Sequence, residues 1–172
     1  MSRLNIITAP DPRLKVKSEA VGHVDDALRK LLDDMLVTMY EAPGIGLSAI
    51  QVGIAKQLIT VDVSADEEER QPLFLINPSI VRMSDAGAIY DEGCLSLPNQ
   101  FAEIERPESI VVEYLDREGA AQTLEADGLL SRCIQHEMDH LQGLLFVDHL
   151  SLMKRNMILR KLQKQRRQKA SA

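Results

Sequence analysis

The stretch GLLSRCIQHEMDHLQG, residues 128–143, combines a helical pattern of apolar residues with two histidines spaced four residues apart. Its apolar side chains recur at the intervals of one helix face, and Gly143 can end the helix. Residues at positions i and i+4 lie one turn apart on the same face, so His136 and His140 can bind a single metal ion. Glu137 lies beside the first histidine, where it can act as general base toward a metal-bound water. The stretch therefore favours a helix that carries a metal site over a helix with two solvated histidines.

Two further helices are expected, one in each half of the chain. Asp25 or Asp26 can cap the first helix, whose apolar residues recur at helical spacing until Pro43 stops it. The second is expected from Leu150 to about Lys169, with its apolar residues along one stripe.

Short strand patterns occupy the middle of the chain. Strands are expected at 54–63, 73–76 and 110–115, with Ile104 also in a sheet and a hairpin turn at 117–119. A helix, several short strands and two more helices, without regular alternation of strand and helix, predict an α+β fold. We expect short antiparallel or mixed β-sheets packed around the central HExxH helix, followed by a C-terminal helix.

The composition is that of an ordinary globular protein. A length of 172 residues suits one domain with one sizeable core. No apolar run approaches the roughly 18 residues that a membrane span needs, and the apolar stretch before Pro10 is too short for a signal peptide. We therefore expect Cys94 and Cys133 to be free thiols or a metal ligand rather than a disulfide.

Charge is distributed unevenly along the chain. Eight of the 20 basic residues follow residue 149, and no acidic residue follows Asp148, so residues 1–149 carry 12 basic and 26 acidic residues, a net charge of −14. This asymmetry calls for an explanation. We divide the chain into a catalytic part, residues 1–149, and a basic C-terminal helix or tail of the same domain, residues 150–172.

The third metal ligand is not decided by the central helix alone. A catalytic site of this kind needs three protein ligands and an open position for water. Phe146 stands where a metzincin would place its third histidine, and no glutamate follows Glu137 to serve as in thermolysin-like enzymes. Asp148 and His149 remain as downstream donors. An upstream ligand is favoured.

Two thiols are upstream candidates. Cys133 lies three residues before His136, but helical side chains lean toward the N-terminus, so its sulfur should point away from an ion held between the histidines. A core position is favoured for Cys133. Cys94 lies in EGCLSLP, residues 92–98, between a glycine and a proline. Spacing alone leaves Cys94 open as a ligand or as a buried loop residue.

Four stretches of the chain resemble the peptide deformylase family. GIGLSAIQ at 44–51, EGCLS at 92–96 and QHEMDHL at 135–141 are similar to its three motifs and occur in the same order. PDPRL at 10–14 is similar to the family's N-terminal segment. Three ordered motifs over nearly the whole chain are far more specific than HExxH alone. The resemblance implies that Cys94, His136 and His140 bind the metal and that Glu137 acts as general base and acid.

The resemblance also implies where the substrate lies. Gln51 and the backbone N–H of Leu95 are expected to hydrogen-bond the formyl oxygen. Gly46 is expected beside the substrate backbone, and Gly93 is a further candidate for contact with the substrate. Ile45 and Leu47 are apolar candidates for the methionine pocket, with core packing as the favoured alternative for each taken alone. One position departs from the family pattern, because Phe101 stands where many members carry arginine. A supporting ion pair between Glu92 and Arg106 is a further hypothesis.

The implied reaction is hydrolysis of the N-formyl group from the N-terminal formylmethionine of newly synthesised polypeptides, with release of formate. The implied cofactor is one divalent metal ion per chain. Fe²⁺ is expected because members of the family commonly use it, and Ni²⁺, Co²⁺ or Zn²⁺ are expected substitutes. Two alternatives stay open: another HExxH metallopeptidase or amidase, and a non-catalytic module stabilised by a metal. The expected setting is the bacterial cytoplasm, with an organelle open if a transit peptide has been removed.

Three interpretations of the basic C-terminal helix compete. It is a solvated face, a phosphate-binding surface, or a helix lying on a membrane surface. The resemblance favours the second, because some relatives dock on the ribosome through a C-terminal helix. Ribosome contact is therefore our hypothesis, and we expect neither DNA nor a membrane as partner.

Overall fold

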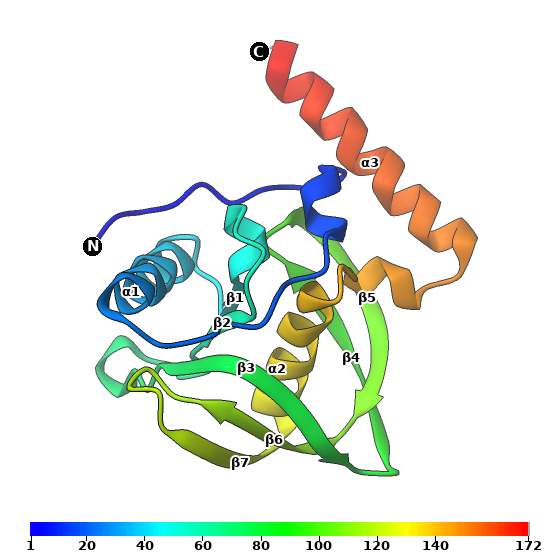
Figure 1. The fold of residues 1–172 in the computed structure, drawn as a ribbon. Helices are drawn as coiled ribbons and strands as arrows, with labels where there is room; N and C mark the ends of the chain where they lie inside the picture. Colours follow the sequence, from blue (N-terminus) through cyan, green and yellow to red (C-terminus); the bar gives the residue numbers. More distant parts are fainter. Residues whose placement is uncertain (172) are drawn as a thin grey trace.

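The computed structural model describes residues 1–171, whose elements are shown in Figure 1. The α-helices are α1 (Asp26–Glu41), α2 (Gly128–Leu141) and α3 (Leu152–Ser171). The strands are β1 (Gly46–Ser48), β2 (Leu58–Val61), β3 (Leu73–Met83), β4 (Gly87–Cys94), β5 (Leu97–Pro107), β6 (Ser109–Leu115) and β7 (Ala121–Asp127). Short 3-10 turns include Ala49–Val52 and Phe146–His149.

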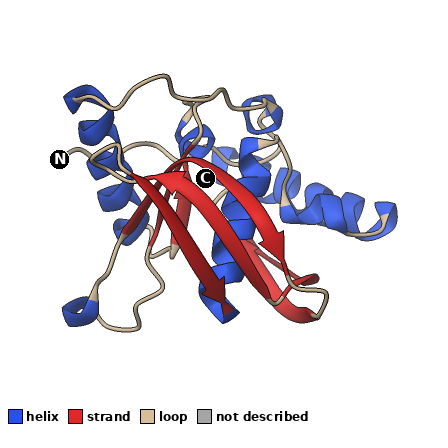
Figure 2. Cartoon of the chain, turned by 60° about the horizontal axis from the view of Figure 1, so that its bottom comes forward, coloured by secondary structure: helices blue, strands red, loops and turns tan. Residues whose placement is uncertain are grey.

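The described strands form two antiparallel sheets (Figure 2). One has the order β1-β2-β3-β6-β7, and the other is the long hairpin of β4 and β5. Helix α2 contacts β1, β2, β6 and β7 of the first sheet and β5 of the second, so it lies between them. The expected α+β architecture, with antiparallel sheets around the HExxH helix and a helix at the C-terminus, is confirmed.

Helix α2 stays central because nearly all of its inner face is buried. Ile134 and Leu141 pack into the core beneath the first sheet, while His136 and Phe146 bring it against the core beside β5. Helix α1 begins at Asp25, whose carboxylate accepts a hydrogen bond from the Leu28 N–H at 2.8 Å, as its capping pattern predicted.

Several expected element boundaries were wrong. The strand expected at 54–63 is limited to β2, and the one expected at 73–76 continues through Pro78 to Met83. Proline interrupts a ladder because it lacks an N–H. The strand accommodates Pro78 with a shift of register between Ile76 and Ser79, where Asn77 has a φ of 52°.

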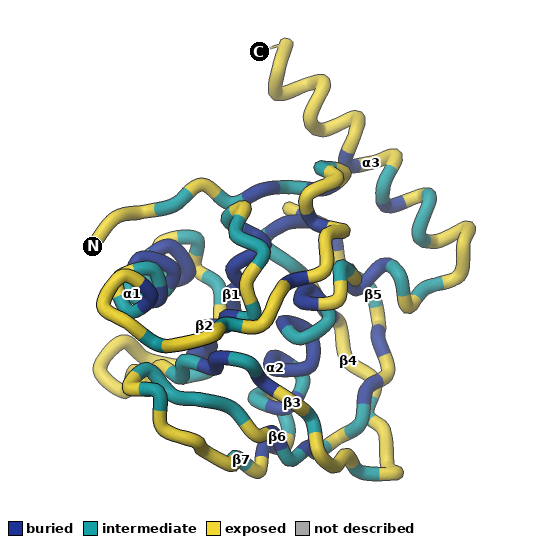
Figure 3. The backbone as a smooth tube through the Cα atoms, in the orientation of Figure 1, coloured by how far each residue is buried: buried dark blue, intermediate teal, exposed yellow. Residues whose placement is uncertain are grey.

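The C-terminal helix begins two residues later than expected and is only partly anchored. Ile158 and Leu162 are buried, but Leu152, Met153 and Met157 of the same expected apolar stripe are exposed. Every described residue beyond Leu162 is exposed, and Figure 3 shows this end of α3 projecting from the body. Within residues 1–171, no helix has both the length and the apolar character needed to cross a membrane.

Candidate active site

Three metal-ligating side chains converge where β4 ends against α2. The candidate ligand atoms of Cys94, His136 and His140 all lie within 4.8 Å of one another. The Cys94 sulfur is 3.4 Å from His140 Nε2. The histidines come from successive turns of α2 and are both buried, whereas Cys94 is the last residue of β4. The fold therefore brings together residues that are more than 40 positions apart in the sequence.

The surroundings of this triad fit a catalytic metal ion. A thiolate with two imidazoles is a donor set that zinc, iron, cobalt and nickel accept, and three protein ligands leave a coordination position open. Glu137, next to the first histidine, is only 3% exposed, and its Oε2 is buried without a hydrogen-bond partner among the described residues. An unpaired buried carboxylate oxygen is costly in a resting protein. It suits a site that receives a cation and a water.

Burial raises the pKa of Glu137 to about 7, and the nearby carboxylates of Glu92 and Asp139 add to this rise. His136 and Arg106 oppose it. A carboxyl group with a pKa near neutrality can both take up and release a proton at physiological pH, which is the property needed in a general base that later acts as acid.

A buried ion pair orients the first histidine. His136 Nδ1 lies 2.9 Å from Glu92 Oε1, and Arg106 donates two hydrogen bonds to the same carboxylate at 2.5 and 2.9 Å. Although burial would raise the pKa of Glu92, the bonds from His136 and Arg106 outweigh it and lower that pKa to about 2. An ionised carboxylate only accepts, so His136 Nδ1 must donate and Nε2 is left for a metal. The hypothesised pair of Glu92 and Arg106 is confirmed.

Gln51 lies beside the cysteine of the triad. Its Oε1 accepts hydrogen bonds from the N–H and hydroxyl of Ser48 at 3.0 and 3.1 Å. Its Nε2 donates to Ser96 Oγ at 3.1 Å and approaches Cys94 Sγ at 3.6 Å. These bonds fix the amide with its NH₂ group toward the metal ligands.

A groove of about 640 Å³ passes over the triad, between the segment before β1 and the hairpin of β4 and β5. Its lining includes Ile45, Gly46, Gly93, Leu95, Phe101 and Arg132. Ile45 is 41% exposed and Phe101 is 67% exposed. Leu47, the other apolar candidate for substrate contact, has a fully buried side chain that packs in the core with α1, as its alternative placement predicted, and it does not line the groove.

Gly46 lies against the centre of the site. A Cβ added there would lie 2.7 Å from both Cys133 Sγ and Glu137 Oε1, so a side chain would not fit without displacing one of them. Cys133 itself is buried, packs in the core and has its sulfur 3.5 Å from the Ile45 carbonyl. It does not belong to the ligand triad, in keeping with the expected lean of its side chain.

The two downstream donors lie outside the triad. Asp148 accepts from the Leu145 N–H and pairs with Arg155, both at 2.8 Å. His149 lies 2.7 Å from the carboxylate of Asp139. Sequence reasoning missed Asp139, although it stands inside the HEMDH motif.

Sequence reasoning also missed Arg132, which lines the groove. The guanidinium group of Arg132 stacks over Tyr90, with its carbon 3.5 Å from the centroid of the ring. No sequence signal marked this contact.

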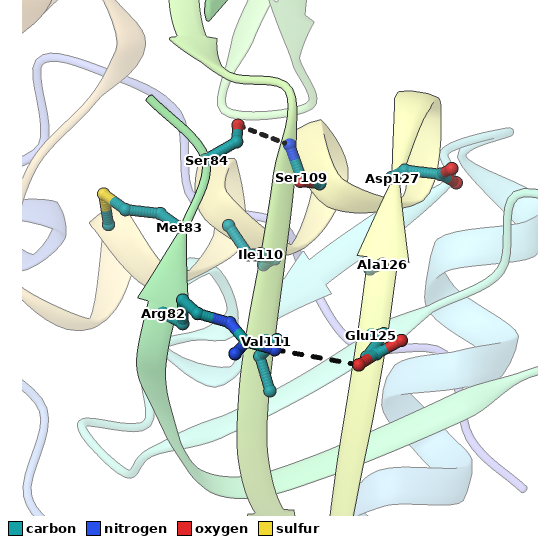
Figure 4. Close-up of a pocket in the computed structure, with 9 residues that line it drawn as sticks. All are labelled: Arg82, Met83, Ser84, Ser109, Ile110, Val111, Glu125, Ala126 and Asp127. Atoms are coloured by element: carbon teal, nitrogen blue, oxygen red, sulfur yellow. Dashed lines mark hydrogen bonds and ion pairs between the residues drawn. The ribbon is translucent and has the colours of Figure 1, made fainter. Parts of the chain in front are cut away.

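A second depression, of about 440 Å³, crosses β3, β6 and β7 (Figure 4). Arg82 and Glu125 face each other across it at 3.8 Å, and the Ser109 N–H donates to Ser84 Oγ at 3.1 Å. Its nine lining residues include no cysteine or histidine and none of the groove residues. The groove over the triad is therefore the candidate active site.

The chain is similar to known proteins over nearly its whole length. The profile of the family described as polypeptide deformylase matches residues 3–156. A peptide deformylase of Rhizobium meliloti (strain 1021) is 54% identical over 159 residues, which cover 92% of this chain and 91% of that protein. The crystal structure of peptide deformylase from Ehrlichia chaffeensis has a TM-score of 0.94 at 42% identity, covering 98% of this chain and 99% of that one. A structure of that organism's peptide deformylase in complex with actinonin has a TM-score of 0.92 at 44% identity, covering 96% and 98%. The chain therefore belongs to the polypeptide deformylase family.

Proposed function

We propose that this chain removes the N-formyl group from the N-terminal formylmethionine of newly synthesised polypeptides and releases formate, using the residues of the groove. As a member of the peptide deformylase family it is a metal-dependent hydrolase that acts on an amide. The observation that supports these residues is the convergence of Cys94, His136 and His140 beside the unpaired carboxylate of Glu137.

The proposed cofactor is one divalent ion held by Cys94, His136 and His140, with Fe²⁺ as the native ion and Ni²⁺, Co²⁺ or Zn²⁺ as substitutes. The mixed thiolate and imidazole donors support this set without separating its members. When bound, the ion supplies Lewis-acid chemistry that makes a water nucleophilic at neutral pH.

Glu137 moves the protons of the reaction. Its carboxylate takes a proton from the attacking water as the oxygen adds to the formyl carbon. It then gives that proton to the nitrogen of methionine as the C–N bond breaks, so formate and a free amino terminus result. The burial that raises the pKa of Glu137 to about 7 favours both steps.

Gln51 and the backbone N–H of Leu95 stabilise the negative charge that grows on the formyl oxygen. The NH₂ group of Gln51 already faces the metal ligands, and Leu95 lines the groove next to Cys94. A preorganised donor of this kind is typically worth roughly 3 kcal/mol in the transition state.

The formylated peptide lies along the groove. Gly46 and Gly93 line this groove, and Ile45 offers apolar surface to the methionine side chain. Phe101 packs over Gly93, with its ring 2.6 Å from where a Cβ of that glycine would be. It therefore offers the residues after methionine an aromatic surface where many relatives offer arginine.

The ribosome is the proposed source of the substrate, which places the protein in the cytoplasm or an equivalent translating compartment. In this proposal residues 1–149 hold the catalytic site, and the basic C-terminal part of the same domain, residues 150–172, docks on the ribosome through α3. The exposed outer part of α3 is basic and carries Lys164, Arg166, Arg167 and Lys169, which suit the phosphates of RNA.

Docking is tested without truncation, because Ile158 and Leu162 belong to the core. Replacing Lys164, Arg166, Arg167 and Lys169 by Gln should leave formate release unchanged and reduce co-sedimentation with ribosomes at low salt. Replacing Lys15, Lys17, Lys30 and Lys56, which lie outside α3, is the matched control. Equal co-sedimentation of the two variants would remove the docking proposal.

The reaction is tested by measuring formate released from a formyl-Met tripeptide by anaerobically prepared, iron- or nickel-loaded protein. Cys94→Ala should abolish both release and stoichiometric metal binding. Cys133→Ala, the same change at the groove's other cysteine, should retain both. Cleavage of an unformylated peptide without formate release would point instead to the metallopeptidase alternative.

A further inference from the structure

A series of charged side chains in contact continues outward from His136 beyond the Glu92–Arg106 pair. Arg106 uses Nε and Nη2 to bind Glu92, and its remaining Nη1 donates to Asp139 Oδ2 at 2.9 Å. The same Oδ2 atom lies 2.7 Å from His149 Nε2. The order of contacts is His136, Glu92, Arg106, Asp139 and His149.

The position of Arg106 depends on two carboxylates. The Arg106 side chain is 5% exposed and that of Glu92 is 8% exposed, so water cannot take the place of either partner. Losing one of them would leave the other charge buried and unpaired, at a large cost in free energy. A guanidinium is a planar fork, and bonding at Nε, Nη2 and Nη1 fixes its orientation. Without Asp139 the fork would keep its bond to Glu92 but lose the contact that stops it from tilting.

Asp139 is in turn held from outside α2. His149 belongs to the 3-10 turn Phe146–His149. Asp148 holds this turn in place, because it accepts a hydrogen bond from the Leu145 N–H and pairs with Arg155 of α3. Asp139 is 22% exposed and His149 is 39% exposed. The outer end of this series of side chains therefore reaches solvent, while its inner end at His136 is buried.

We propose that Asp139, held by His149, is a positioning residue that acts through Arg106 and Glu92 to orient His136, and thereby sets the affinity of the site for its metal. The proposal rests on the function proposed above, in which His136 is a ligand. Partners outside the ligand shell typically contribute 10- to 100-fold to metal affinity. We place Asp139 at the lower end, because it acts through two intermediate side chains.

The test compares Asp139→Asn with Asp33→Asn in cobalt-loaded protein. Both carboxylates are partly exposed, 22% and 29%, and each pairs with an arginine, at 2.9 and 2.7 Å, but only Asp139 leads to the ligands. Competition with a chelator should show a cobalt Kd about tenfold higher for Asp139→Asn, with altered ligand-field absorption. Asp33→Asn, on α1, should leave both unchanged. A Kd within twofold of the parent protein for Asp139→Asn would overturn the proposal.

His149 supplies the second arm of the test. His149→Ala should raise the Kd severalfold, and His149→Gln, which keeps a donor near Nε2, should restore it. Adding His149→Ala to Asp139→Asn should cause no further rise, because His149 acts only through Asp139; additive effects would contradict this. A parent protein that binds cobalt at this site but releases no formate would refute the proposed reaction while leaving the metal-affinity test intact.

Discussion

Helix α2 buries the polar side chains of the site, whereas most of α3 presents its charges to solvent. His136, Glu137 and His140 are each less than 9% exposed, and the two histidines contact Glu92 and Cys94. Beyond Leu162, every described residue of α3 is exposed. A buried charge depends on the geometry of its partners, while an exposed charge contributes through the total field and is screened by salt. Substitutions should therefore be severe and specific on α2, and mild and cumulative on α3.

The largest effect is expected for Glu137→Gln. Removing the group that transfers the proton should lower kcat by about 10³-fold or more, while cobalt or nickel binding stays stoichiometric because Glu137 is not a ligand. Formate release and metal content measure the two quantities. Glu125→Gln, in the depression of Figure 4, is the matched control and should behave as the parent. A Glu137→Gln enzyme with a substantial fraction of parental kcat would contradict the assigned role.

Gly46→Ala should come next. The added Cβ would lie 2.7 Å from Glu137 Oε1 and Cys133 Sγ, so it must displace the catalytic carboxylate or the core thiol. We expect a loss of about 1–3 kcal/mol in the free energy of unfolding together with a clear fall in kcat. Gly22→Ala meets no atom within 4 Å and should change neither by much. Urea unfolding and formate release measure the two quantities. If the two variants behaved alike, the close packing at Gly46 would be unimportant.

The buried pair at Glu92 should give a smaller, pH-dependent effect. The pKa of Glu92 is lowered from 4.5 to about 2 in the folded chain, so its ionised form stabilises folding above about pH 4.5. That stabilisation is lost as the pH falls from about 4.5 toward about 2. Urea unfolding in the presence of a chelator should show a shallower decline over this range for Glu92→Gln. An identical decline in the parent and the variant would mean that this pair contributes nothing.

The smallest effect is expected on α3. Arg166→Gln and Arg167→Gln remove charges from an exposed helix surface, where substitutions usually change stability by less than about 0.5 kcal/mol. Thermal unfolding should therefore be nearly unchanged, in contrast to any substitution of Arg106. A fall in Tm as large as that of Arg106→Gln would erase the distinction between the buried charges that pack against α2 and the exposed charges of α3.

Local patterns predicted helices better than strands. The helical spacing of apolar residues located both α1 and α2 well, and the cap at Asp25 marked the start of α1. The ends of β2 and β3 were missed because strands end where their neighbours stop pairing, and β3 passes through Pro78 by a register shift that only its partner β6 makes possible. Exposure of Met157 and burial of Ile158 on α3 likewise depend on where the body lies beneath the helix.

The sequence by itself determined the α+β class, the central HExxH helix and the family, because these follow from local periodicity and from motifs read in order. The motifs also implied Cys94 as the third ligand, but only the tertiary structure shows how it meets the histidines, that Leu47 faces the core, and that Asp139 links Arg106 to His149. The physical reason is that a metal site and its supporting charges are made of contacts between distant segments. Such contacts are set by how β4, β5 and the turn Phe146–His149 pack against α2, and no local period records that packing.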